Sequence, residues 1–130
     1  MNTKWMKVTF ATSAIYDGVL GLLFLFLGTA MYDYFGIERP NHLGYLHFPA
    51  LLIIVFAVMY WRIASDPAKF RDLIPYGIGL KISYCLVVFY HWTTGAIPAM
   101  WVPFAWLDLI FLILFYQAWR KIGTVNRSAA

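Results

Sequence analysis

Four long apolar stretches, separated by short polar segments, constrain this chain more than any other feature. They cover about residues 8–31, 43–63, 76–92 and 103–119. About 20 consecutive apolar residues are enough for a helix to cross a bilayer, where only helices and closed barrels satisfy their own backbone. Hydrophobic residues make up 62% of the 130 and charged residues 12%, a balance that a soluble globule of this size has no interior to accommodate. The sequence therefore predicts one integral membrane domain over 1–130, an all-α, four-helix transmembrane bundle.

The basic residues predict the orientation of this bundle. Lys and Arg close to the ends of spans are retained on the cytoplasmic side. Eight of the ten lie before the first stretch, between the second and third, or after the fourth: Lys4, Lys7, Arg62, Lys69, Arg71, Arg120, Lys121 and Arg127. Short connections favour an up-down-up-down order, so we expect both termini inside (N-in/C-in). The net charge of +4 is spread around the spans rather than gathered on one face, which argues against a nucleic-acid partner and leaves membrane lipids as the expected surroundings.

Polar segments and aromatic residues suggest where the spans end. Asp66 and Pro67 suit an N-cap and first helical position, which predicts a short juxtamembrane helix over about 67–73. Tyr60 and Trp61 are placed at the cytoplasmic interface by the preference of amphipathic rings for that depth. The polar tail after Lys121 is expected to fray.

Three ionisable residues, Asp17, Lys81 and Asp108, fall inside the predicted spans. Each is costly near the bilayer centre unless it is paired or faces water. A rise of 1.5 Å per residue puts Asp17 and Lys81 at about the same depth from the cytoplasmic side, with Asp108 slightly deeper. Each also shares a helical face with residues expected to pack inward, so we expect the three to form one cluster. Tyr16 and Tyr84 are expected to line the same site.

Two carboxylates and one ammonium leave this cluster with a formal charge of −1. Either burial holds one carboxylic acid protonated or a bound cation completes the site. One interpretation is a structural ion network that fixes the order of the helices. The alternatives are a site for a substrate, a lipid headgroup or a proton, with Gly21 helping to line it, and an interface in which one charge reaches another subunit.

A second polar group is expected near the outer face and contains Glu38, His42, His47 and His91. Imidazole and carboxylate groups bind zinc, copper or iron, so these residues are the metal-ligand candidates, and paired histidines could hold haem. Their spacing matches no helical metal motif and favours histidines bonded to loop carbonyls or water. Cys85 stands alone in the middle of a span, as expected of a packed thiol.

Several short motifs resemble the DoxX-like small four-helix bacterial membrane proteins. They are Tyr16–Asp17–Gly18 with Gly21, Asp66–Pro67–x–x–Phe70–Arg71, Gly77 with Lys81, and Asp108–x–x–Phe111. The resemblance covers about residues 13–120 and implies an antiparallel bundle in a bacterial cytoplasmic (inner) membrane. Some members of that family are similar to subunits that work with quinone-linked sulfur oxidation. The resemblance transfers no catalytic residue to this chain.

Three functional hypotheses follow. The first is non-enzymatic: an accessory or scaffolding subunit of a larger bacterial membrane complex, because so small a chain exposes little surface outside the membrane. The second is a binding or transport protein for a small hydrophobic or amphiphilic molecule, with Asp17, Lys81 and Asp108 at its polar end. The third is a redox protein with a quinone or metal near His47 and His91. The sequence itself identifies no cofactor, ligand or partner complex.

Overall fold

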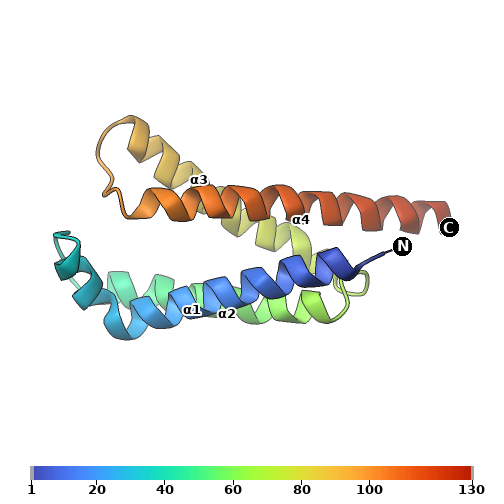
Figure 1. The fold of residues 1–130 in the computed structure, drawn as a ribbon, viewed down its shortest axis with the longest axis horizontal. Helices are drawn as coiled ribbons and strands as arrows, with labels where there is room; N and C mark the ends of the chain where they lie inside the picture. The colour runs from blue at the N-terminus through green and yellow to red at the C-terminus, as the bar shows by residue number, and fades with distance from the viewer. Residues whose placement is uncertain (1, 130) are drawn as a thin grey trace.

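The computed structural model describes residues 2–129 and is a bundle of four helices in up-down-up-down order (Figure 1). The helices are α1 (Lys4–Tyr34), α2 (Gly44–Ser65), α3 (Ile74–Thr93) and α4 (Trp101–Ala129), with a 3-10 turn, η1 (Arg71–Leu73), before α3. All four are long and apolar enough to cross a membrane. The all-α, four-helix transmembrane fold is thereby confirmed. Both loops 35–43 and 94–100 lie at one end, named here the two-loop end, and the chain termini lie with segment 66–73 at the other, the terminal end.

Two expectations for the terminal end were wrong. Residues 67–70 form a turn and only Arg71–Leu73 is helical, so no continuous juxtamembrane helix covers 67–73. Asp66 does cap this turn, because its Oδ1 accepts a hydrogen bond from the Lys69 backbone N–H at 3.2 Å. Pro75 supplies the physical reason for the break: it has no N–H to donate to the Arg71 carbonyl, which accepts instead from the Ile74 N–H and closes a 3-10 turn.

The polar tail is the second correction, since α4 continues to Ala129 instead of fraying after Lys121. The extra turns are held by burial, because Ile122 is completely inaccessible and packs in the core. Arg71 adds a tie between η1 and α4: its Nε donates to the Trp119 carbonyl at 3.0 Å, and its guanidinium lies 4.6 Å from the centre of the Trp119 ring.

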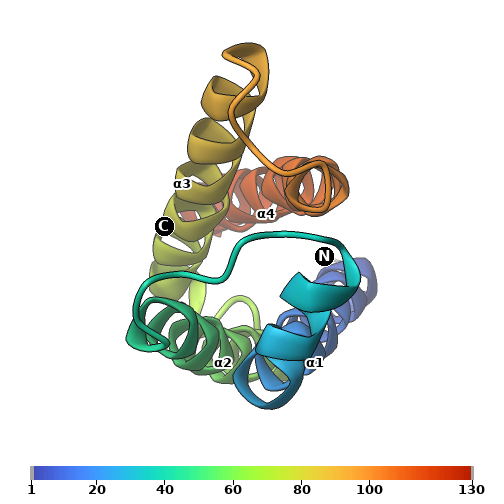
Figure 2. The same cartoon turned by 90° about the vertical axis from the view of Figure 1, so that its left-hand side faces the viewer.

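The four helices pack as two hairpins, α1 with α2 and α3 with α4, and α2 meets α3 over a much smaller area. Figure 2, which views the two-loop end, shows α3 diverging from the first hairpin. Within that hairpin the backbones approach closely at Gly21, where an added Cβ would lie 2.6 Å from Ile54 Cγ1 and 2.9 Å from the Ala50 carbonyl oxygen. Small residues permit such an approach. Gly21 therefore belongs to the α1–α2 contact. The expectation that it helps to line a ligand site was wrong.

The main hydrophobic core lies at the terminal end and joins the two hairpins. Its completely inaccessible members come from all four helices: Met6, Phe10, Tyr60, Ile63, Ile74, Phe115, Ala118 and Ile122. The Phe10 and Phe115 rings stack across the hairpins with their centres 4.4 Å apart. A smaller cluster of Phe24, Leu46 and Ala50 lies toward the two-loop end, where Met100 and Trp101 pack against it. The bundle is thus sealed at one end and more open at the other.

Candidate functional site

The three intramembrane charges meet in the interior of the bundle. Lys81 on α3 donates from Nζ to Asp17 Oδ2 on α1 at 2.8 Å and to Asp108 Oδ1 on α4 at 3.0 Å. All three residues are buried. The prediction that Asp17, Lys81 and Asp108 form one cluster is confirmed, and a single ammonium therefore links the two hairpins.

Helical spacing on all three elements directs these side chains inward. Lys81 lies one turn from Gly77 and one turn from Cys85, both of which are buried. Asp17 is likewise one turn from two small buried residues, Ser13 and Gly21. Residues four apart share a face, so small neighbours leave room beside each charge for the partner from another helix.

Three aromatic rings surround the Lys81 ammonium beyond its two carboxylates. Its Nζ lies 5.3 Å from the centre of the Phe111 ring, 5.4 Å from Tyr60 and 5.8 Å from Tyr16. An ammonium over an aromatic face is attracted by the ring quadrupole, and more strongly where water is excluded. The rings therefore help to compensate the desolvation of a lysine inside the membrane.

Tyr60 is the member of this site that the sequence analysis missed. It had been placed at the cytoplasmic interface, yet it is completely inaccessible, and its hydroxyl donates to the Gly77 carbonyl at 3.2 Å. The available signal was its spacing from Ala57 and Ile63, which lie three residues to either side and are both buried. Gly77 is the structural reason for its position, because an added Cβ there would lie 2.6 Å from Tyr60 Cε1.

Tyr16 and Tyr84 lie beside the cluster without donating to it. The Tyr84 hydroxyl donates to the Trp101 carbonyl at 3.0 Å and so ties α3 to the start of α4. The Tyr16 hydroxyl is buried and has no hydrogen-bond partner within residues 2–129. A buried hydroxyl without a partner is costly, and Tyr16 lines the same cavity as both aspartates.

A cavity of about 400 Å³ extends from the cluster toward the two-loop end. Asp17, Lys81 and Asp108 line its end next to the main core, named here the floor, and Tyr32, Tyr45 and Trp101 line its end nearest the loops. Its other lining residues come from both hairpins and are apolar or aromatic: Tyr16, Leu20, Phe24, Leu46, Pro49, Ala50, Ile53, Leu80, Tyr84, Val87, Val88, Ile97 and Phe104. Ligand sites are commonly concave and mostly apolar, with a few polar groups placed to orient the ligand. The cavity between the hairpins has that composition.

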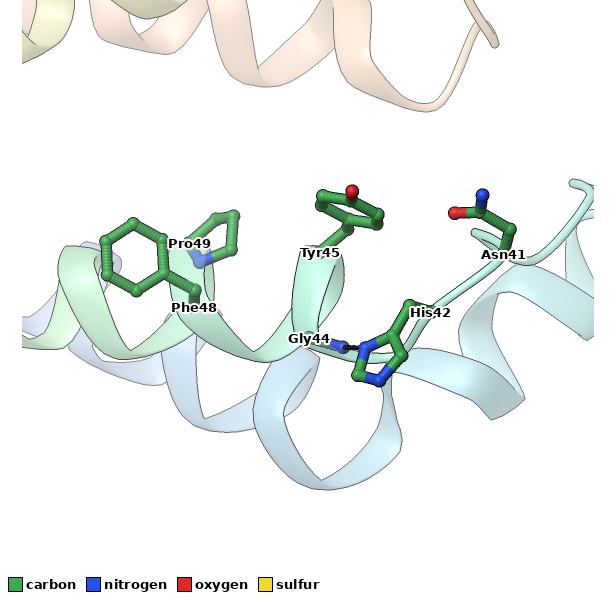
Figure 3. Close-up of a pocket in the computed structure, with 6 residues that line it drawn as sticks. All are labelled: Asn41, His42, Gly44, Tyr45, Phe48 and Pro49. Atoms are coloured by element: carbon green, nitrogen blue, oxygen red, sulfur yellow. Dashed lines mark hydrogen bonds between the residues drawn. The ribbon is translucent and has the colours of Figure 1, made fainter.

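The outer polar residues form no comparable site. Within the part of the chain that the structure describes, no three His, Cys, Asp or Glu side chains are close enough together to hold a metal ion, so Glu38, His42, His47 and His91 are not brought into one group. His42 Nδ1 accepts the Gly44 backbone N–H at 2.9 Å (Figure 3). These residues line a shallow hollow on the surface of the protein. In Figure 3 the side chains of Tyr45 and Pro49 lie on the opposite side of the backbone from the His42 ring. His91 is exposed at the end of α3.

Cys85 is packed between α3 and α4. The residue is buried, and its thiol lies 3.4 Å from the Ala105 carbonyl oxygen. This arrangement is that of a small apolar side chain with a weak S–H donor, in agreement with the packed thiol that was expected.

The fold and the site together define a class: a transmembrane four-helix bundle with a buried Asp–Lys–Asp cluster at the floor of a cavity between its hairpins. No family model, curated protein or solved structure matches this chain. Its resemblance to the DoxX-like proteins remains a prediction, as does its placement in a bacterial inner membrane.

Proposed function

We propose that this protein binds a small amphiphilic molecule inside the membrane, with the polar end of the ligand at Asp17, Lys81 and Asp108. One observation carries the proposal: the buried cluster borders a cavity whose other lining residues are apolar or aromatic. A network that only fixes helix order needs no empty volume beside it, because unfilled space weakens packing. The positive-inside orientation predicted above would place the end of the cavity nearest the loops toward the outer side of the membrane.

The two halves of the bundle suit this role in different ways. At the terminal end, Phe10, Tyr60 and Phe115 close the space between the hairpins below the charges. Toward the two-loop end the cavity lies between the hairpins, and Val88 and Ala50 are the most deeply buried apolar residues of its walls. Binding energy gained from the walls would come from burying apolar surface, and orientation from the polar floor.

A pair of valine variants tests the proposal. Val88 lines the cavity and is 2% exposed, whereas Val55 on α2 lies outside the lining and is 62% exposed. Val88→Phe is expected to fill part of the cavity, and Val55→Phe adds the same ring to the outer surface. After gentle detergent extraction, mass spectrometry of the intact protein should detect a bound small molecule in the wild type and in Val55→Phe, and much less of it in Val88→Phe. Equal small-molecule content in the two variants would contradict the proposal.

The accessory-subunit hypothesis makes a separate prediction that the same extraction tests. An obligate subunit should migrate within a large assembly on a native gel, accompanied by stoichiometric neighbours. The exposed apolar faces of the helices suit lipid and partner helices equally well, so they do not favour this hypothesis over a bundle surrounded by lipid. The redox hypothesis placed a quinone or a metal near His47 and His91. Among residues 2–129 neither belongs to a group of three metal-ligating side chains, and the quinone alternative stays a prediction.

A further inference from the structure

We infer that the ligand of this cavity is a cation, specifically an amine or quaternary ammonium compound with a short apolar tail. The inference rests on the proposed function and adds the chemical class of the ligand. It starts from the accessibility of the three charged side chains, which is 1% for Lys81, 6% for Asp17 and 11% for Asp108. All three residues line the cavity, and the two carboxylates are more accessible than the ammonium.

The acceptor capacity of these carboxylates is only partly used. Asp17 bonds Lys81 through Oδ2 and Asp108 bonds it through Oδ1. The second oxygen of each accepts no hydrogen bond from the described part of the chain, although a carboxylate has room for several donors. A group that reaches the floor of the cavity thus meets unused acceptors on two buried aspartates. Such a floor favours a hydrogen-bond donor or a positive charge.

The charge balance points in the same direction. With both carboxyl groups ionised, the two carboxylates and one ammonium sum to −1 in a region of low dielectric, where an uncompensated charge is costly. A cationic ligand brings the total to zero, whereas a carboxylic acid ligand in its ionised form brings it to −2. Among the lining residues, Lys81 alone is basic, and it is already bonded to both aspartates.

The walls also fit a cation with a small apolar body. Aromatic rings attract ammonium groups through their faces, and the lining close to the floor includes Tyr16, Tyr84 and Phe104. Farther out, Phe24 and Trp101 stack with their ring centres 5.3 Å apart. A volume of about 400 Å³ lies in the lower part of the range of small-molecule sites, so short tails are expected.

Matched eight-carbon probes test the charge requirement. Octylammonium, octanol and octanoate are titrated into the full-length protein in nanodiscs of zwitterionic lipid, and empty nanodiscs correct for partitioning. Saturable changes in tryptophan fluorescence report binding, because Trp101 lines the cavity. The cation is expected to bind about tenfold or more tightly than octanol, and octanoate more weakly than either, since one charge-assisted contact is worth at least that factor.

Two Asp→Asn variants supply the comparison. Asp108→Asn is expected to weaken binding of the cation about tenfold and to change octanol binding less than about twofold. Retained octanol binding also shows that the variant is folded. Asp33→Asn is the control, because Asp33 is exposed at the end of α1, where it pairs with Arg39 outside the cavity lining. It should leave both affinities unchanged. If the cation and octanol bind the wild type equally and Val88→Phe removes both, the cavity binds ligand but the cation inference is overturned. If no probe binds saturably, the proposed function fails as well.

Discussion

Gly77 offers a sharp test of the packing around the charged cluster. In Gly77→Ala the new Cβ would lie 2.6 Å from Tyr60 Cε1. The Tyr60 ring is completely inaccessible and is packed against Phe10 and Phe115, with ring centres 6.4 and 5.1 Å away, so it has little space into which to withdraw. Overpacking of this kind costs about 1–3 kcal/mol, and straining the hydrogen bond from the Tyr60 hydroxyl to the Gly77 carbonyl adds about 1 kcal/mol. The higher helix propensity of alanine returns about 1 kcal/mol. The free energy of unfolding should therefore fall by about 1–3 kcal/mol.

Gly79 is the matched control, two residues along the same helix. An alanine Cβ at Gly79 would meet nothing within 4 Å, so Gly79→Ala should keep the propensity gain of about 1 kcal/mol without a clash. The two variants should then differ by about 2–4 kcal/mol in reversible unfolding by sodium dodecyl sulfate in mixed micelles, followed by far-ultraviolet circular dichroism. A second comparison introduces Gly77→Ala into a Tyr60→Leu background. The smaller side chain relieves the clash there, so Gly77→Ala should lower the free energy of unfolding by less. Equal effects of the two alanine substitutions, or an unchanged cost in the Tyr60→Leu background, would refute this account of the packing.

Three further predictions use the same preparation. Gly21→Ala should destabilise the protein by about 1–3 kcal/mol more than Gly18→Ala, because an added Cβ meets the backbone of α2 at Gly21 but only an ordinary contact at Gly18; similar midpoints would count against the close α1–α2 approach. Lys81→Met should lower the free energy of unfolding by about 3–5 kcal/mol, because it leaves two buried carboxylates without an ammonium. Asp17→Asn should lower it by less, because Lys81 and Asp108 remain as a neutral pair. A larger loss in Asp17→Asn than in Lys81→Met would contradict the charge balance. Cys85 should react slowly with a membrane-permeant maleimide in the folded protein and fully after unfolding, as measured by intact mass, whereas rapid labelling of the folded protein would show that the thiol is not packed.

The helices and the meeting of the charges could be predicted because both depend on properties of single segments. Hydropathy marks a span without reference to its neighbours. The depth of an ionisable residue follows from its distance in sequence from the end of a span. Asp17, Lys81 and Asp108 each lie on the face of their own helix that packs inward, and at similar depths the high cost of leaving them apart favours pairing.

Features that depend on contact between helices were not predictable in this way. Tyr60 follows the pattern of an interfacial aromatic residue when α2 is considered alone, and its burial requires the space that Gly77 leaves on α3. The polar composition after Lys121 indicated fraying, but Ile122 and the contact of Arg71 with Trp119 extend the packed part of α4. The cavity is likewise a property of the angle between two hairpins, which no local pattern in either hairpin encodes.

The sealed end of the bundle explains how a cavity and a buried ion cluster can coexist in so small a protein. The core around Phe10, Tyr60 and Phe115 holds the hairpins together next to the charges. This packing fixes the positions of the charged residues along the helices relative to one another. Lys81 then links both hairpins at the boundary between the packed half and the open half. Because the charges are already held in place, a ligand entering from the two-loop end would meet a floor whose geometry costs little further entropy to organise, which is the advantage of a preorganised site. Packing in the open half would then be free to follow the shape of the proposed ligand rather than the needs of the fold.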